Sequence, residues 1–140
     1  MAKFNKILVP LDGSSNSMRG LDRAIEIAKG SAAEITGFYV FHLPVAAGIK
    51  YTAKMKDEAQ RKAVKAIGPA MNKTQKAGAV FKYKTGGGNT GSEIVKFAKN
   101  GKFDMIVIGA RGVGGAKEAF LGSTSNYVMH KTKVPVLVVK

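Results

Sequence analysis

The sequence of 140 residues contains no cysteine and only two histidines. The lack of cysteine excludes a disulfide framework, thiol catalysis and zinc sites built on thiolates. His42 and His130 lie far apart in the sequence, so we expect structural roles for them and no histidine-rich metal site. A chain of this length can bury roughly two-thirds of its unfolded surface, which suffices for a core without cross-links. We therefore expect residues 1–140 to form one domain.

Acidic residues are also scarce. Nine aspartates and glutamates stand against 23 lysines and arginines, which leaves a formal net charge of +14. Such an excess raises the local concentration of polyanions, among them nucleotides, nucleic acids and anionic membranes, but it does not indicate a fold.

Long hydrophobic runs are missing as well. The longest, residues 35–49, is interrupted by Thr36, His42 and Pro44 and falls short of the ~20 residues that span a bilayer. The apolar stretch near the N-terminus meets Pro10 and is too short for the core of a signal peptide. We expect a soluble, cytoplasmic protein without a membrane partner.

Short apolar segments alternate with amphipathic ones along the chain. Apolar runs without alternation are typical of strands buried on both faces, and apolar spacings of three and four predict helices. We expect strands at 6–10, 34–41, 80–84, 103–108 and 134–139, and helices that begin near 15, 52, 90 and 123. This order predicts an α/β fold: a single open parallel five-stranded sheet with helices on both faces, of the Rossmann-like class.

Individual residues predict where the helices begin and end. Gly30 is placed to end the first helix. Pro69, after Gly68, should kink or break the second helix, because proline removes a donor and clashes with the preceding turn. Thr90 and Glu93 fit a capping box at the start of the third.

Parallel sheets of this kind bind ligands where the strand order reverses, which selects the turns after the first and fourth strands. The second of these turns is a glycine-rich loop, residues 109–122. Its glycines let backbone N–H groups approach an anion, and the following helix offers unpaired donors and partial positive charge. Arg111 and Lys117 add charge nearby. The same residues also fit a plain surface loop with a serine N-cap, and composition leaves both interpretations open.

The loop carries a spaced glycine pattern. Gly109, Gly112, Gly122 and Ser123 form Gly-x2-Gly-x9-Gly-Ser, which resembles the nucleotide-binding pattern of the ATP-binding subgroup of the universal stress protein family. The resemblance covers essentially the whole chain. Three further segments resemble the family's opening strand and turn, its fourth strand and its closing strand: residues 7–14, 103–112 and 134–139.

This resemblance implies a fold like that of the adenine nucleotide alpha hydrolases and the role of an ATP-binding, stress-response signalling module. By similarity, Asp12 is the acidic residue near the ribose, and Pro10 packs beside it. Val40 matches the position whose backbone groups contact the adenine edge.

The resemblance also implies the phosphate contacts, the ion and the partner. Gly109 and Gly112 match the family's close-approach glycines, and Gly122, Ser123 and Thr124 match its phosphate donors. Mg²⁺ or Mn²⁺ would be held mainly through the phosphates, since the sequence shows no cluster of carboxylates. A homodimer through the C-terminal strand is implied too, and this strand is apolar to its end, as an edge strand that pairs with another chain would be.

Two features depart from the family pattern. The net charge of +14 is unusual, and the turn after the third strand spans residues 85–91 in place of a shorter segment. Through Gly86, Gly88 and Gly91 this turn also matches the dinucleotide fingerprint Gly-x-Gly-x-x-Gly. The half-polar strand before it, and the place of Asp104 at the start of the next strand, argue for a flexible glycine turn instead. A Walker A loop is absent from the sequence.

Nucleic-acid binding is one alternative function. Residues 50–84 are strongly basic, with Asp57 and Glu58 as their only acidic residues, and Phe81 and Tyr83 could stack on bases. These rings alternate with lysines, which places them on the core side of their strand, so we do not favour a nucleic-acid partner.

Slow ATP hydrolysis on the same fold is the other alternative. A catalytic base must lie within reach of the reacting group. Asp12 would lie by the sugar and Glu118 in the loop, while Ser14 and Ser15 have no histidine near them in the sequence. We expect ATP binding with slow or absent hydrolysis.

Overall fold

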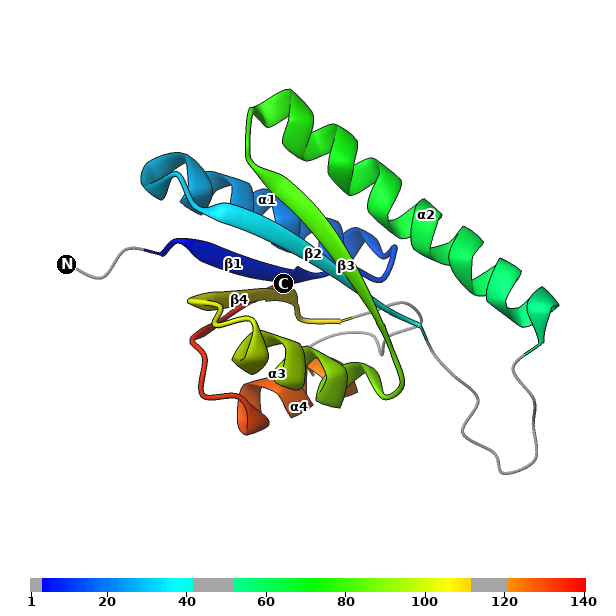
Figure 1. Cartoon of the computed structure of the whole chain (residues 1–140). Coiled ribbons are helices and arrows are strands. Elements are labelled where there is room, and N and C mark those ends of the chain that lie inside the picture. The colour runs from blue at the N-terminus through cyan, green and yellow to red at the C-terminus, as the bar shows by residue number, and fades with distance from the viewer. Residues whose placement is uncertain (1–3, 42–51, 112–120) are drawn as a thin grey trace.

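The structure is a computed structural model that describes residues 4–41, 52–111 and 121–140. Five strands alternate with four helices within these residues, as the sequence predicts (Figure 1). The elements are β1 (Lys6–Pro10), α1 (Ser15–Ser31), β2 (Glu34–Phe41), α2 (Ala53–Ala77), β3 (Phe81–Gly87), α3 (Thr90–Asn100), β4 (Met105–Gly109), α4 (Ser123–Lys131) and β5 (Val136–Val139).

The strands form one open parallel sheet in the order β3-β2-β1-β4-β5. Helices α1 and α2 cover one face of the sheet, and α3 and α4 cover the other (Figure 1). The predicted fold class is confirmed. The direction of strand addition reverses between β1 and β4, so the carboxyl ends of these two strands mark the switch point.

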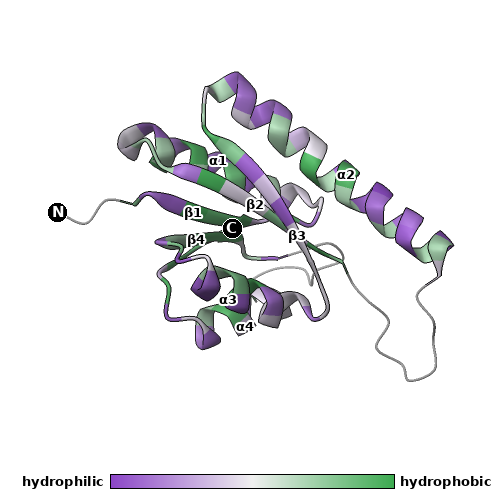
Figure 2. Cartoon of the chain, viewed as in Figure 1, coloured by the Kyte–Doolittle hydropathy of each residue, from purple (hydrophilic) through white to green (hydrophobic). Residues whose placement is uncertain are grey.

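The core lies in two layers, one on each face of the sheet. Along β1, Ile7 and Val9 face the α1–α2 layer and Leu8 faces the α3–α4 layer, and all three are fully buried. Burial on both faces explains why β1 and β4 are runs of apolar residues. In Figure 2, β4 is largely hydrophobic, whereas hydrophilic residues interrupt the edge strand β3.

Two predicted helix ends are wrong by one or two residues. Helix α1 continues through Gly30 and ends at Ser31, and Ala32 takes the left-handed conformation with φ of 57°. Helix α3 is capped by Asn89, whose side chain accepts from Ser92 N at 3.0 Å, so the predicted capping box is displaced. Asparagine ranks above threonine as an N-cap, which agrees with Asn89 taking the position expected of Thr90.

Helix α2 is continuous over 25 residues and includes Pro69, so the predicted break is wrong. Pro69 has no N–H to donate to the carbonyl of Lys65, one turn earlier. Because Pro69 is exposed, this carbonyl lies on the side of the helix that water reaches. The opposite side is a stripe of small and apolar residues that holds the helix to the sheet: Ala63, Ala66, Ile67, Ala70 and Thr74.

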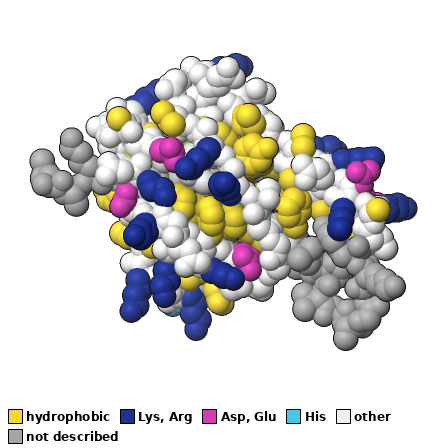
Figure 3. Space-filling model, in the orientation of Figure 1, with side chains coloured by type: hydrophobic (Ala, Val, Ile, Leu, Met, Phe, Trp, Pro, Cys, Tyr) yellow, Lys and Arg dark blue, Asp and Glu magenta, His cyan; other side chains and the backbone are white. Residues whose placement is uncertain are grey.

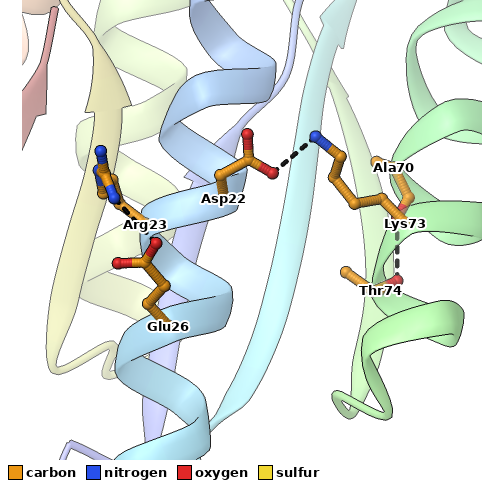
Figure 4. Close-up of polar contacts among 6 residues, drawn as sticks. All are labelled: Asp22, Arg23, Glu26, Ala70, Lys73 and Thr74. Carbon is orange, nitrogen blue, oxygen red and sulfur yellow. Dashed lines mark hydrogen bonds and ion pairs between the residues drawn. The ribbon is translucent and has the colours of Figure 1, made fainter.

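Polar contacts also join the two helices on this face. Lys73 Nζ of α2 lies 2.6 Å from Asp22 Oδ1 of α1, and Thr74 Oγ1 donates to Ala70 O at 2.9 Å within α2 (Figure 4). The Lys73–Asp22 ion pair and the buried stripe give α2 a defined position against α1 and the sheet.

Strand β3 lies at an edge of the sheet, and it extends to Gly87, three residues further than predicted. Phe81 packs against the core. Tyr83, two residues further along, lies on the same face of the strand as expected, but it is 49% exposed and so is not part of the core. An edge strand with incomplete helix cover explains this exposure. Among the described helices, none is long and apolar enough to cross a membrane.

Candidate functional site

A cleft of about 930 Å³ opens at the carboxyl ends of β1, β2 and β4. It is lined from one face of the sheet by the start of α1 and the middle of α2, and from the other by the first turns of α3 and α4. This is the switch point at which a sheet of this topology binds its ligand.

The β1–α1 turn forms one wall of the cleft. Asp12 Oδ1 accepts from Ser14 N at 2.9 Å and from Ser14 Oγ at 2.5 Å. Ser14 in turn caps α1, since its Oγ accepts from Ser17 N at 3.1 Å. Gly13 has φ of +86°, a conformation that favours glycine. The turn is therefore held by its own hydrogen bonds, with the Asp12 carboxylate placed at the cleft.

The end of β2 forms the floor with Phe38, Tyr39 and Val40. Pro10, the last residue of β1, is in register with Phe38, and Leu11 N donates to Phe38 O at 2.9 Å. Peptide groups alternate in direction along a strand, so those of Val40 face the same side as those of Phe38. They therefore point past the end of β1 and toward the cleft, as the contact with an adenine edge requires.

At the end of β4, Gly109 lies against the first turn of α1. A Cβ at this position would lie 2.6 Å from Asn16 Oδ1 and 2.8 Å from Asn16 O. Asn16 is buried, and its Oδ1 accepts from Arg111 N at 2.7 Å. Close helix packing thus requires glycine at this position whether or not a ligand binds, a cause that the glycine spacing alone did not reveal.

The two described ends of the glycine-rich loop meet beside this contact. Ala110 O accepts from Gly122 N at 2.7 Å and from Ser125 Oγ at 2.8 Å, which joins the end of β4 to the start of α4. Side chains cap α1, α2 and α3, whereas the N-cap of α4 is Gly122, which offers no side-chain cap. The first N–H groups of α4 belong to Ser123 and Thr124, which line the cleft. The first N–H groups of a helix have no partner within the helix, so these two are donors for a ligand.

The charges around the cleft are mainly positive. Lys62, Lys65 and Arg111 line it, and Asp12 is the only carboxylate among its described lining residues. Burial, and to a lesser extent the Asp12 carboxylate, raise the pKa of Tyr39 above its usual 10.0, so its phenol is a hydrogen-bond donor at neutral pH. Figure 3 shows that Lys and Arg side chains also outnumber acidic ones on the face it draws.

Most residues that the sequence predicts for the site lie together. Eight of them line the cleft: Pro10, Asp12, Val40, Gly109, Arg111, Gly122, Ser123 and Thr124. The ninth, Gly112, lies outside the described residues, as do Lys117, Glu118 and His42. The analysis of the sequence missed Tyr39 and the two α2 lysines. Tyr39 could have been found as the neighbour of Val40, whereas the basic stretch of residues 50–84 did not single out these two lysines.

Packing accounts for the second glycine motif. Gly86 lies on the edge strand β3, where a Cβ would come 2.9 Å from the Phe38 ring, and a Cβ at Gly91 would come 2.7 Å from the Tyr127 ring. Asp104, the acidic residue considered for a dinucleotide, accepts instead from two backbone N–H groups near the start of β1, each at 2.9 Å. None of the three glycines of the motif lines the cleft, although Thr90 between them does.

Metal ligands do not gather in the described part of the chain, which holds no group of three or more His, Asp or Glu side chains suited to an ion. His130 lies in the last turn of α4, as expected, where a cation suits the helix dipole. A divalent ion in this cleft would need most of its ligands from the bound molecule.

The chain matches the universal stress protein family over residues 3–140. It belongs to the universal stress protein family. The universal stress protein YxiE of Bacillus subtilis is 33% identical over 98% of this chain and 99% of its own. MJ0577 of Methanocaldococcus jannaschii superimposes with a TM-score of 0.87 at 27% identity, over 99% of this chain and 97% of its own.

A further relative was solved with a nucleotide. A universal stress protein in complex with cAMP superimposes with a TM-score of 0.75 at 25% identity, over 99% of this chain and 98% of its own. The match of the family model and the identity to YxiE confirm the family membership that the sequence analysis predicted.

Proposed function

We propose that this universal stress protein binds an adenine nucleotide, ATP, in the cleft between β1 and β4 and acts as a soluble, cytoplasmic signalling module. One observation carries the proposal. Residues of the glycine pattern and the N-terminus of α4, which no side chain caps, lie together at the switch point of the sheet. Backbone N–H groups at a helix N-terminus favour phosphate. The cAMP complex of a relative supports an adenine nucleotide as the ligand class.

Each part of the cleft has a role in this proposal. The peptide groups of Val40 contact the adenine, and Asp12 holds the ribose with Pro10 beside it. Arg111 lies where the phosphates would pass. The phosphates themselves are contacted by the glycine-rich loop and by α4, through Gly109, Gly112, Gly122, Ser123 and Thr124.

The donor set also bears on the ion and on catalysis. Asp12 is the one carboxylate among the described lining residues, so Mg²⁺ or Mn²⁺ would be held mainly by phosphate oxygens. No histidine and no second carboxylate of the described lining stands beside it as a base, so we propose binding with little turnover. ATP turnover that survives purification and is lost in Asp12→Ala would replace binding with hydrolysis.

A thermal-shift titration with ATP and magnesium tests the proposal. A ligand at 100 times its Kd stabilises a fold by about 2.7 kcal/mol, which gives a clear rise in Tm. In Gly122→Val the rise should disappear, because the side chain blocks the approach of phosphate to α4. Gly30→Val is the matched control, since a Cβ there meets no atom within 4 Å. An unchanged Tm in the wild-type protein over the titration refutes ATP binding.

Nucleic-acid binding is the second candidate, and the exposure of Tyr83 is the observation in its favour. It ranks below ATP because Lys82 is engaged by Glu34 at 2.8 Å, and Lys82 and Lys84 point to the face opposite Tyr83. Affinity for DNA or RNA that falls steeply with rising salt would support this candidate.

A further inference from the structure

The cleft has a second polar wall that the glycine pattern does not include. Lys62 and Lys65 of α2 line it from the α1–α2 face of the sheet. Ser123 and Thr124 of α4 line it from the opposite face. The cleft therefore offers donors to an anion from both faces.

Packing fixes the position of the α2 wall. Ala66 is buried, and its Cβ lies 3.8 Å from the position that a Cβ on Gly13 would take. Lys65 precedes Ala66 directly, and Lys62 lies one turn before it. The two lysines thus stand over the β1–α1 turn that carries Asp12, while Ala63 and Ala70 hold the helix to the sheet.

These two lysines have no carboxylate partner within 4 Å among the described residues. Elsewhere on α2 such partners exist: Arg61 pairs with Asp57 at 3.3 Å, and Lys73 pairs with Asp22 at 2.6 Å. Where α2 borders the cleft, its positive charge is thus left available to a ligand.

The size of the cleft leaves room for such a ligand. Its volume of about 930 Å³ lies near the upper end of the ~300–1,000 Å³ that small-molecule sites span. In the proposed pose the ribose lies at Asp12, so Lys62 and Lys65, which stand over the β1–α1 turn, are the cleft lysines on the ribose side.

We propose that Lys62 and Lys65 form a second phosphate subsite, for an adenine nucleotide that carries an additional phosphate on the 2′ or 3′ oxygen of its ribose. This inference rests on the proposed function, which places the base and the ribose. Lysine ammonium groups bind phosphate as point charges, and two of them at an exposed cleft should raise affinity roughly tenfold.

Isothermal titration calorimetry at fixed ionic strength tests the inference. AMP is compared with adenosine 3′,5′-bisphosphate and adenosine 2′,5′-bisphosphate, and ADP serves as the ligand whose second phosphate lies on the tail. We expect one bisphosphate to bind about tenfold tighter than AMP. In the double variant Lys62→Gln, Lys65→Gln, the ratio of bisphosphate affinity to AMP affinity should fall to about one.

A matched variant controls for total charge. Lys54→Gln with Lys76→Gln removes the same charge from exposed positions of α2 outside the cleft, and it should keep the gain. Bisphosphates that bind no tighter than AMP overturn the inference but leave the proposed function intact. A double variant that loses affinity for ADP instead places the lysines at the phosphate tail, which also overturns the inference. Failure of AMP, ADP and ATP all to bind refutes the proposed function itself.

Discussion

Replacing Gly109 by alanine should destabilise the ligand-free protein, even though the glycine belongs to a nucleotide-binding pattern. The new Cβ would lie 2.6 Å from Asn16 Oδ1, 2.8 Å from Asn16 O and 2.9 Å from Asn16 C. Overpacking of this kind costs about 1–3 kcal/mol. Displacing Asn16 also weakens its hydrogen bond to Arg111 N, which contributes about 1 kcal/mol. We expect a total loss of roughly 2–4 kcal/mol in the free energy of unfolding.

Urea unfolding without nucleotide measures this loss, and a second substitution tests its cause. In a double-mutant cycle, Gly109→Ala should cost less stability in the Asn16→Ala background than in the wild-type protein, because Oδ1 is removed. The rescue should stay incomplete, since two of the three close atoms belong to the backbone. Gly30→Ala, at an open helical position, should instead be neutral or slightly stabilising. A Gly109→Ala protein within about 0.5 kcal/mol of wild type would refute the packing argument.

Three further outcomes follow from described contacts. The pKa of Tyr39 is raised in the folded state, so as pH rises past 10.0 the unfolded chain loses the phenol proton first and the free energy of unfolding falls. Tyr39→Phe should make this fall with pH less steep in thermal melts, and an unchanged slope contradicts the prediction. Asp12→Asn should lower the pKa of Tyr39 only in part, since burial is the larger cause; a return to 10.0 in the tyrosine titration would show otherwise. The resemblance implies a homodimer through the edge strand β5, on which Leu137 is 37% exposed, so Leu137→Lys should give a monomer by light scattering; a wild-type monomer refutes the dimer.

Much of the fold was predictable because strands that are buried on both faces consist of consecutive apolar residues. Strands β1 and β4 are covered on both faces and read as uninterrupted apolar runs, so their place and their switch point followed from the sequence. Pro69 misled because its effect depends on which side of α2 faces water. The exposure of Tyr83 depends on β3 being an edge, which strand alternation alone does not reveal.

The candidate site was predictable to the extent that it follows spacing along the chain. Gly122 and its neighbours could be found from the glycine pattern. The contact between Gly109 and Asn16 joins distant parts of the chain, and no local pattern encodes it. Lys62 and Lys65 resemble any solvated lysines of an amphipathic helix until the position of α2 over the β1–α1 turn is known.

The placement of phosphate at the start of α4 can be examined residue by residue with an NMR titration of ¹⁵N-labelled protein by ATP and magnesium. Saturable shifts should appear at the amides of Ser123, Thr124 and Gly109, together with Val40 at the adenine side. Amides at Ser123 and Thr124 that stay fixed at saturating ATP would contradict nucleotide binding in this cleft.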